Sequence, residues 1–257
     1  MTPSDLLTDF REVVDDQVLP YLYTDATAFR WMAEAEREAA VRARLIYDET
    51  TVATCRIPIV AGQVRYPVDP RMFDILDVWL DRPATGVATQ SKHLRRVDQS
   101  NARDGSRPFI YDLENQDSFY THRHDYGNDW CGGNGALRLG NELHQYSIDG
   151  KLLSLYTIPD TSFTDDPAVL RLCGYRLPLV PVADDTSVFE IPDVHHDGLI
   201  HWLVYRASKQ KDAEELDDKR SLEALATFES RFGSRPPANS LRMQAEGRSW
   251  QTGYGGY

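Results

Sequence analysis

The spacing of hydrophobic residues changes twice along this chain, and the order of those changes constrains the fold. Apolar residues recur at helical spacing in residues 1–50, alternate in several stretches of residues 51–191, and return to helical spacing in residues 192–232. Helices at both ends of a chain can pack together only if the region between them leaves the helical bundle and then returns to it. The sequence therefore predicts an α+β fold, with the terminal helices in one helical bundle and an inserted antiparallel β domain between them.

The first two helices have clear start signals. Thr2 can cap a helix that has Pro3 at its first position and Asp5 near the exposed amides. Thr24 can cap a second helix, which carries small residues at Ala28 and Ala35 and so allows a neighbouring helix to approach closely. The remaining faces of this helix are predicted to carry charged residues, namely Glu34, Glu36, Arg37, Glu38, Arg42 and Arg44.

The central region has the alternation that is typical of strands. Residues 55–59 and 64–68 alternate on either side of Gly62, a pattern that predicts a β-hairpin. Further strands are predicted over residues 75–80, 151–158 and 168–177.

The closing helices are predicted to begin after Pro192 and to end at Gly233. Their apolar side chains recur at spacings of three and four, as expected for residues that face a common core. The predicted bundle-core residues are Leu199, Trp202, Leu203 and Phe228.

Composition excludes several classes of protein. The chain of 257 residues is 41% hydrophobic, enough to bury a core, and its net charge of −12 argues against binding nucleic acid by neutralising phosphates. No apolar run is long enough to span a bilayer, and the N-terminus does not have the pattern of a signal peptide. The three dispersed cysteines, Cys55, Cys131 and Cys173, are typical of reduced thiols in a cytosolic protein.

One cluster of residues has the types that bind metals. It comprises His122, His124, Asp125, Asp129, Cys131 and His144. Several glycines and asparagines interrupt it, so it is predicted to be a loop without the supporting residues that hold metal ligands in place. We therefore expect no metal site, no cofactor site and no catalytic centre.

Residues 233–257, the C-terminal arm, are rich in glycine, proline and serine and cannot form a core by themselves. The arm is basic on an otherwise acidic chain, and its aromatic residues are suited to act as anchors in a partner's pockets. We expect it to be a docking arm, although it could also fold back on its own bundle. The predicted docking residues are Arg235, Arg242, Arg248, Trp250, Tyr254 and Tyr257.

Several segments, in order, resemble bacteriophage head-to-tail connector proteins, the adaptor, tail accessory or tail tubular protein A-like family. The first matching region comprises Leu19-Pro20-Tyr21-Leu22-Tyr23 and residues 33–40. The second comprises residues 155–160 and 170–178, and the third comprises Ile191-Pro192-Asp193 and Leu199-Ile200-His201-Trp202. In residues 81–150 we identify no segment with this resemblance, and we expect an expanded loop and strand region there.

The resemblance implies a structural protein of the virion neck, without enzymatic activity or cofactors. It implies a homo-oligomeric ring, usually of twelve copies, that is assembled in the host cytoplasm, docks under the portal protein and joins the DNA-filled capsid to a downstream tail or nozzle protein. Genomic DNA would pass through the channel without specific binding, and no membrane would be involved. The portal would receive the C-terminal arm, with a neighbouring ring subunit as the second choice.

Two alternatives remain at this level. The chain could be a metal-assisted or cell-wall hydrolase that uses the loop of His122 and His124. It could also be a β-sandwich virion protein that binds a glycan or a receptor through the loops of its β domain.

Overall fold

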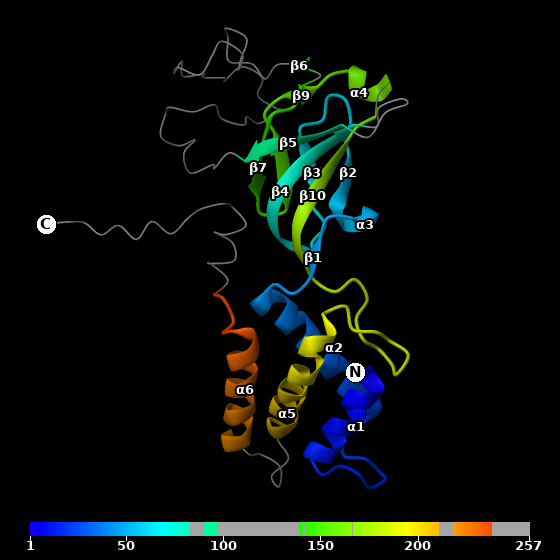
Figure 1. The fold of residues 1–257 in the computed structure, drawn as a ribbon, viewed down its shortest axis with the longest axis vertical. Helices are drawn as coiled ribbons and strands as arrows, with labels where there is room; N and C mark the ends of the chain where they lie inside the picture. The colour runs from blue at the N-terminus through cyan, green and yellow to red at the C-terminus, as the bar shows by residue number, and fades with distance from the viewer. Residues whose placement is uncertain (83–89, 97–138, 141, 166, 211–217, 238–257) are drawn as a thin grey trace, which may run out of the picture. The chain divides into compact units, whose positions relative to one another are not determined.

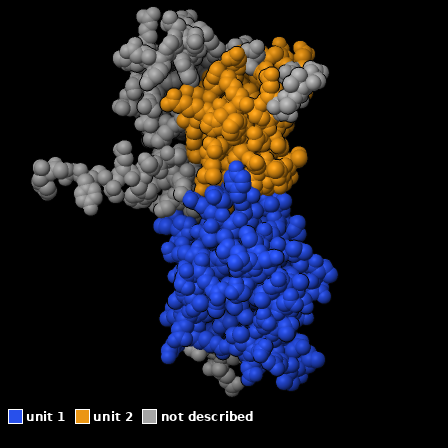
Figure 2. Space-filling view, viewed as in Figure 1, with its two compact units in different colours: residues 1–47, 175–237 blue, residues 48–174, 238–257 orange. Residues whose placement is uncertain are grey.

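The structure is a computed structural model that describes residues 1–82, 90–96, 139–140, 142–165, 167–210 and 218–237 (Figure 1). It divides into two compact units, shown in different colours in Figure 2. The helical unit comprises residues 1–47 and 175–237, and the described part of the β unit lies within residues 48–174. Residues 175–191, assigned to the β domain from the sequence, lie in the helical unit in this division.

The helical unit contains segments from both halves of the sequence. From the N-terminal part come α1 (Pro3–Val13) and α2 (Asp25–Ala43). From the C-terminal part come the 3₁₀ helix η2 (Asp193–Leu199), α5 (Ile200–Ser208) and α6 (Asp218–Phe232).

The start signals of the first two helices are confirmed. The Asp5 N–H donates to the Thr2 hydroxyl at 3.2 Å, and the Thr2 N–H donates to the Asp5 carboxylate at 2.8 Å, which forms a capping box. In α2, the Thr24 hydroxyl accepts from the Thr27 N–H at 3.3 Å. Local sequence therefore determines where these two helices begin.

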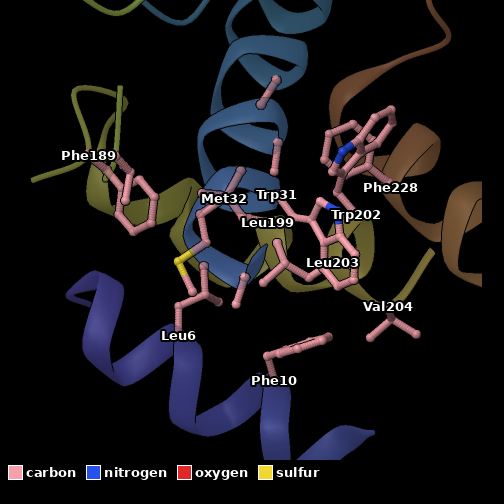
Figure 3. Close-up of a cluster of buried hydrophobic side chains, with 14 of the residues drawn as sticks. Leu6, Phe10, Trp31, Met32, Phe189, Leu199, Trp202, Leu203, Val204 and Phe228 are labelled. Atoms are coloured by element: carbon pink, nitrogen blue, oxygen red, sulfur yellow. The ribbon is translucent and has the colours of Figure 1, made fainter. Parts of the chain in front are cut away.

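A single hydrophobic cluster joins all of these helices (Figure 3). Leu6 and Phe10 of α1 belong to it, as do Trp31 and Met32 of α2. The four residues expected in the core, Leu199, Trp202, Leu203 and Phe228, are all buried there. Burying each large apolar side chain contributes about 1.5–3 kcal/mol, so this cluster is a major source of the unit's stability.

The β unit is built on a sheet with the strand order β1-β10-β4-β5-β7-β8-β3 in the described residues, with β2 paired to β10. A second, two-stranded sheet pairs β6 with β9. Two short helices, α3 (Val52–Cys55) and α4 (Ser162–Asp165), complete this unit. The strand bounds are β1 (Tyr47–Asp48), β2 (Arg56–Pro58), β3 (Arg65–Pro67), β4 (Met72–Arg82), β5 (Gln90–Arg96), β6 (Leu139–Gly140), β7 (Gln145–Asp149), β8 (Leu152–Leu155), β9 (Ile158–Pro159) and β10 (Val169–Arg176).

The α+β class is confirmed, but the sheet is mixed and not antiparallel throughout. Strand β5 pairs with β7 in parallel, with Arg95 opposite Gln145, and β6 also pairs with β9 in parallel. A parallel pair needs a long connection between its strands. Periodicity within each strand does not reveal such a pairing.

The predicted hairpin around Gly62 is wrong. Strand β2 pairs with β10, and β3 pairs with β8, so the two segments belong to different neighbours. The alternation marks which side chains are buried, including Cys55 and Tyr66, but it does not choose the partner strand. The Tyr66 hydroxyl instead fixes the intervening turn by donating to the Gln63 carbonyl at 2.8 Å.

Candidate functional site

The end of α6 is where the C-terminal arm begins. Gly233 adopts φ 87°, which favours glycine, and its N–H donates to the Glu229 carbonyl at 2.8 Å. The helix therefore ends at the residue that the sequence indicates, and the arm leaves the helical unit from a defined point.

Arg42 of α2 holds this point to the rest of the unit. Its guanidinium forms ion pairs with Glu38 at 3.2 Å and Glu229 at 3.3 Å, and donates to the Gly233 carbonyl at 3.3 Å. It also lies 5.4 Å from the ring centre of Trp202 and 5.2 Å from that of Phe228. These distances permit cation–π attraction, and the Arg42 side chain is only 3% exposed.

Arg235 continues the attachment of the arm. Its guanidinium lies 3.6 Å from Glu38, the carboxylate that also pairs with Arg42. Arg235 is the one predicted docking residue that the structure describes. The others, Arg242, Arg248, Trp250, Tyr254 and Tyr257, lie outside the described residues.

The sequence did not lead us to predict these contacts of Arg42, because the charged residues of α2 were expected to face solvent. The available signal was its spacing of four residues from Glu38, which places both side chains on one helical face. Nothing in that spacing indicates the contacts with α6.

Glu36 of α2 is a second residue whose environment differs from the predicted one. It was placed among the charged residues that cover the helix, yet it is fully buried. Its Oε1 accepts from the Glu190 N–H at 2.5 Å and the Ile191 N–H at 3.4 Å, whereas its Oε2 has no hydrogen-bond partner. Burial raises the pKa of Glu36 from 4.5 to about 6, even though the two N–H groups favour the charged form.

The neighbourhood of Glu36 includes another buried polar group. The two ring nitrogens of His196 lie 2.9 Å from the main-chain carbonyl oxygens of Met1 and Ile191. Glu36 and His196 therefore fasten the segment before η2 to α2 and to the N-terminus. Their role is structural, because each of these four hydrogen bonds is with the main chain.

The connection between α1 and α2 exposes apolar side chains on a fixed base. The two carboxylate oxygens of Asp16 accept from the N–H groups of Leu22 and Tyr23 at 2.8 and 3.1 Å. Beyond this base, Val18 and Leu19 are 80% and 73% exposed. Exposed apolar residues held in a defined loop are suited to contact another protein.

The described residues contain no group of three His, Cys, Asp or Glu side chains that could hold a metal ion. His122, His124, Asp125, Asp129 and Cys131 lie outside the described residues. The remaining member of the predicted cluster, His144, lies 3.1 Å from the exposed carboxylate of Glu142. Cys55 and Cys173 are buried.

Comparison with known proteins assigns the chain to a family. The family model described as SU10 adaptor protein matches residues 1–253. The chain belongs to the SU10 adaptor protein family. No curated protein matches it.

SU10 adaptor proteins are a family of phage head-to-tail adaptors, which confirms the resemblance found in the sequence. Membership implies a structural virion component that interacts with portal and tail proteins, and not an enzyme. Among the described residues, no helix combines the length and hydropathy needed to cross a bilayer.

Proposed function

We propose that this chain forms a homo-oligomeric ring of twelve copies that docks under the portal and connects the DNA-filled capsid to the tail. The observation that carries the proposal is the adaptor-family match over residues 1–253, because it includes both the helical and the β unit. In this proposal the terminal helices act as one bundle, and the inserted β domain faces outward or toward the next tail or nozzle protein. Assembly takes place in the host cytoplasm.

The channel proposal rests on charge. The chain carries 40 acidic and 28 basic residues, giving a net charge of −12. Acidic walls repel phosphate at short range, so DNA can slide past them without being held. The proposed role of the ring is therefore to surround the genome and not to bind it.

We assign attachment to the portal to the C-terminal arm. Arg42 and Arg235 fix the beginning of this arm to α2, so the following residues start from a rigid support. The arginines and aromatic residues beyond it, Arg242, Arg248, Trp250, Tyr254 and Tyr257, supply charge and anchors for acidic clefts in the portal.

Deleting residues 238–257 tests this assignment, because the shortened chain keeps Arg42, Gly233 and Arg235. Its attachment to portal-bearing capsids should be lost, while its thermal midpoint should match that of the full chain. Full attachment without these residues would refute the docking role. A matched variant, in which Arg242 and Arg248 are alanine and the aromatic residues are kept, measures the contribution of charge alone.

A further inference from the structure

Two exposed arginines on α2, Arg30 and Arg37, differ from the other cationic side chains of the helical unit. Within the described part of that unit, neither has an ion pair, hydrogen bond or ring contact. The other described arginines and lysines each contact a carboxylate, a main-chain carbonyl or an aromatic ring. On a chain with a net charge of −12, two such arginines on one helix need an explanation.

Their positions define a single face. Arg30 and Arg37 are seven residues apart, which is two turns, so they lie on the same side of α2 about 10 Å apart along its axis. Ala33 and Glu34, both half-buried, lie between the two arginines, and the Glu34 carboxylate pairs with Arg206 of α5 at 3.3 Å; Ala26 is exposed one turn before Arg30. Because Arg206 already pairs with the carboxylate between them, Arg30 and Arg37 are left available to attract the carboxylates of another protein surface.

The outer face of α1 has the opposite charge. Asp5 and Glu12 are exposed, lie away from the buried Leu6 and Phe10, and are again seven residues apart, whereas Asp9 is half-buried at the edge of this face. Asp9 and Glu12 have no ion pair in the part of the chain that the structure describes. The Asp5 carboxylate accepts the Thr2 N–H, and this capping contact keeps its pKa low and its charge in place.

We propose that the Arg30 and Arg37 face of α2 receives the acidic α1 face of a second copy of this chain, and that this contact repeats around the ring. The inference rests on the proposed ring. A ring requires two different, complementary faces on each subunit, and the helical unit supplies them with opposite charge and equal spacing. Two arginines on an acidic chain are too few to bind DNA through phosphate neutralisation, which favours a protein partner.

Charge reversal tests the contact in the full chain. The variants are Arg30→Glu with Arg37→Glu, Asp9→Lys with Glu12→Lys, and all four changes together. Each pair of reversals should raise the concentration for half-assembly about tenfold or more, measured by sedimentation velocity or by copies bound per portal-bearing capsid. The fourfold variant should restore assembly, because it exchanges the signs of both faces.

A matched control places the same charge change elsewhere. Arg65 and Arg95 are exposed on strands of the β unit, so Arg65→Glu with Arg95→Glu should leave assembly unchanged. All variants should keep a melting midpoint close to that of the wild type, because the changed side chains are exposed, except for Asp9, which is half-buried and has no ion pair among the described residues. Added salt should weaken assembly of the wild type, because salt screens the attraction between the two charged faces.

The outcomes separate this inference from the proposed function. If the wild type assembles and the charge-reversal variants assemble equally well, the α1–α2 contact is refuted and the proposed ring still stands. A wild-type chain that stays monomeric both in solution and on portal-bearing capsids would refute the ring and the contact together. Loss of binding to duplex DNA in Arg30→Glu with Arg37→Glu, with assembly unchanged, would assign the face to DNA instead.

Discussion

Replacing Glu36 with glutamine should stabilise the protein at neutral and alkaline pH. Burial raises the Glu36 pKa from 4.5 to about 6, and a shift of that size corresponds to about 2 kcal/mol. Nearby Glu190 raises this pKa further, while His196 and the N–H groups of Glu190 and Ile191 lower it. Glutamine keeps an oxygen for both N–H groups and removes the buried charge.

The sign of the pH dependence follows from proton binding. The folded protein holds the Glu36 proton more tightly than the unfolded chain does, so stability falls as pH rises from 4.5 to about 6. Above pH 6 the buried charge lowers the stability of the folded protein by the full amount of about 2 kcal/mol. We therefore expect Glu36→Gln to raise the free energy of unfolding by about 2 kcal/mol at pH 8 and by about 1 kcal/mol at pH 5.

Urea unfolding followed by circular dichroism at the two pH values measures this difference. Groups that titrate equally in both proteins cancel in the comparison. Glu223→Gln, at an exposed carboxylate of α6, serves as the control and should change stability little at either pH. The reasoning fails if Glu36→Gln is no more stable than the wild type at pH 8, or if the gain is the same at both pH values.

Three further predictions concern the core, the sheet and the metal content. Trp202→Ala removes a buried ring that packs 5.0 Å from Phe228 and should lower stability by about 3–5 kcal/mol in urea unfolding; an unchanged midpoint would place Trp202 outside the core. Gly174→Ala would bring a Cβ within 2.2 Å of the Asp74 carbonyl oxygen. It should therefore lower the melting midpoint far more than Gly150→Ala, where the added Cβ meets open space and only the φ of +59° opposes the change; equal effects would contradict this close approach. Elemental analysis after dialysis should find well below one zinc per chain, and a stoichiometric amount would revive the hydrolase alternative.

Local signals in the sequence were sufficient for the helix starts. Thr2, Asp5 and Thr24 make the predicted capping contacts because capping depends only on residues within one turn. The burial of Leu199 and Phe228 likewise agrees with their helical spacing. Such features depend on neighbours in the sequence, which the sequence displays directly.

The pairing of strands that are distant in the sequence could not be predicted from such local signals. The residues of β2 and β3 alternate as a hairpin would, yet the two strands bond to β10 and β8, because alternation specifies a buried face and not a partner. Arg42 and Glu36 were missed because charged residues on a helix usually face solvent. For Glu36, the detectable sign was its spacing of four residues from buried Met32, which places it on the apolar stripe.

The chain leaves and re-enters the helical unit at adjacent points. The Arg176 N–H donates to the Ile46 carbonyl at 3.0 Å, and the rings of Tyr47 and Tyr175 lie 5.9 Å apart. A few glycines could therefore join residue 47 directly to residue 175 and bypass the β unit. In evolution, the same adjacency would let one helical scaffold exchange its insertion for another without disturbing its own core, so that the inserted part could change while the scaffold was kept.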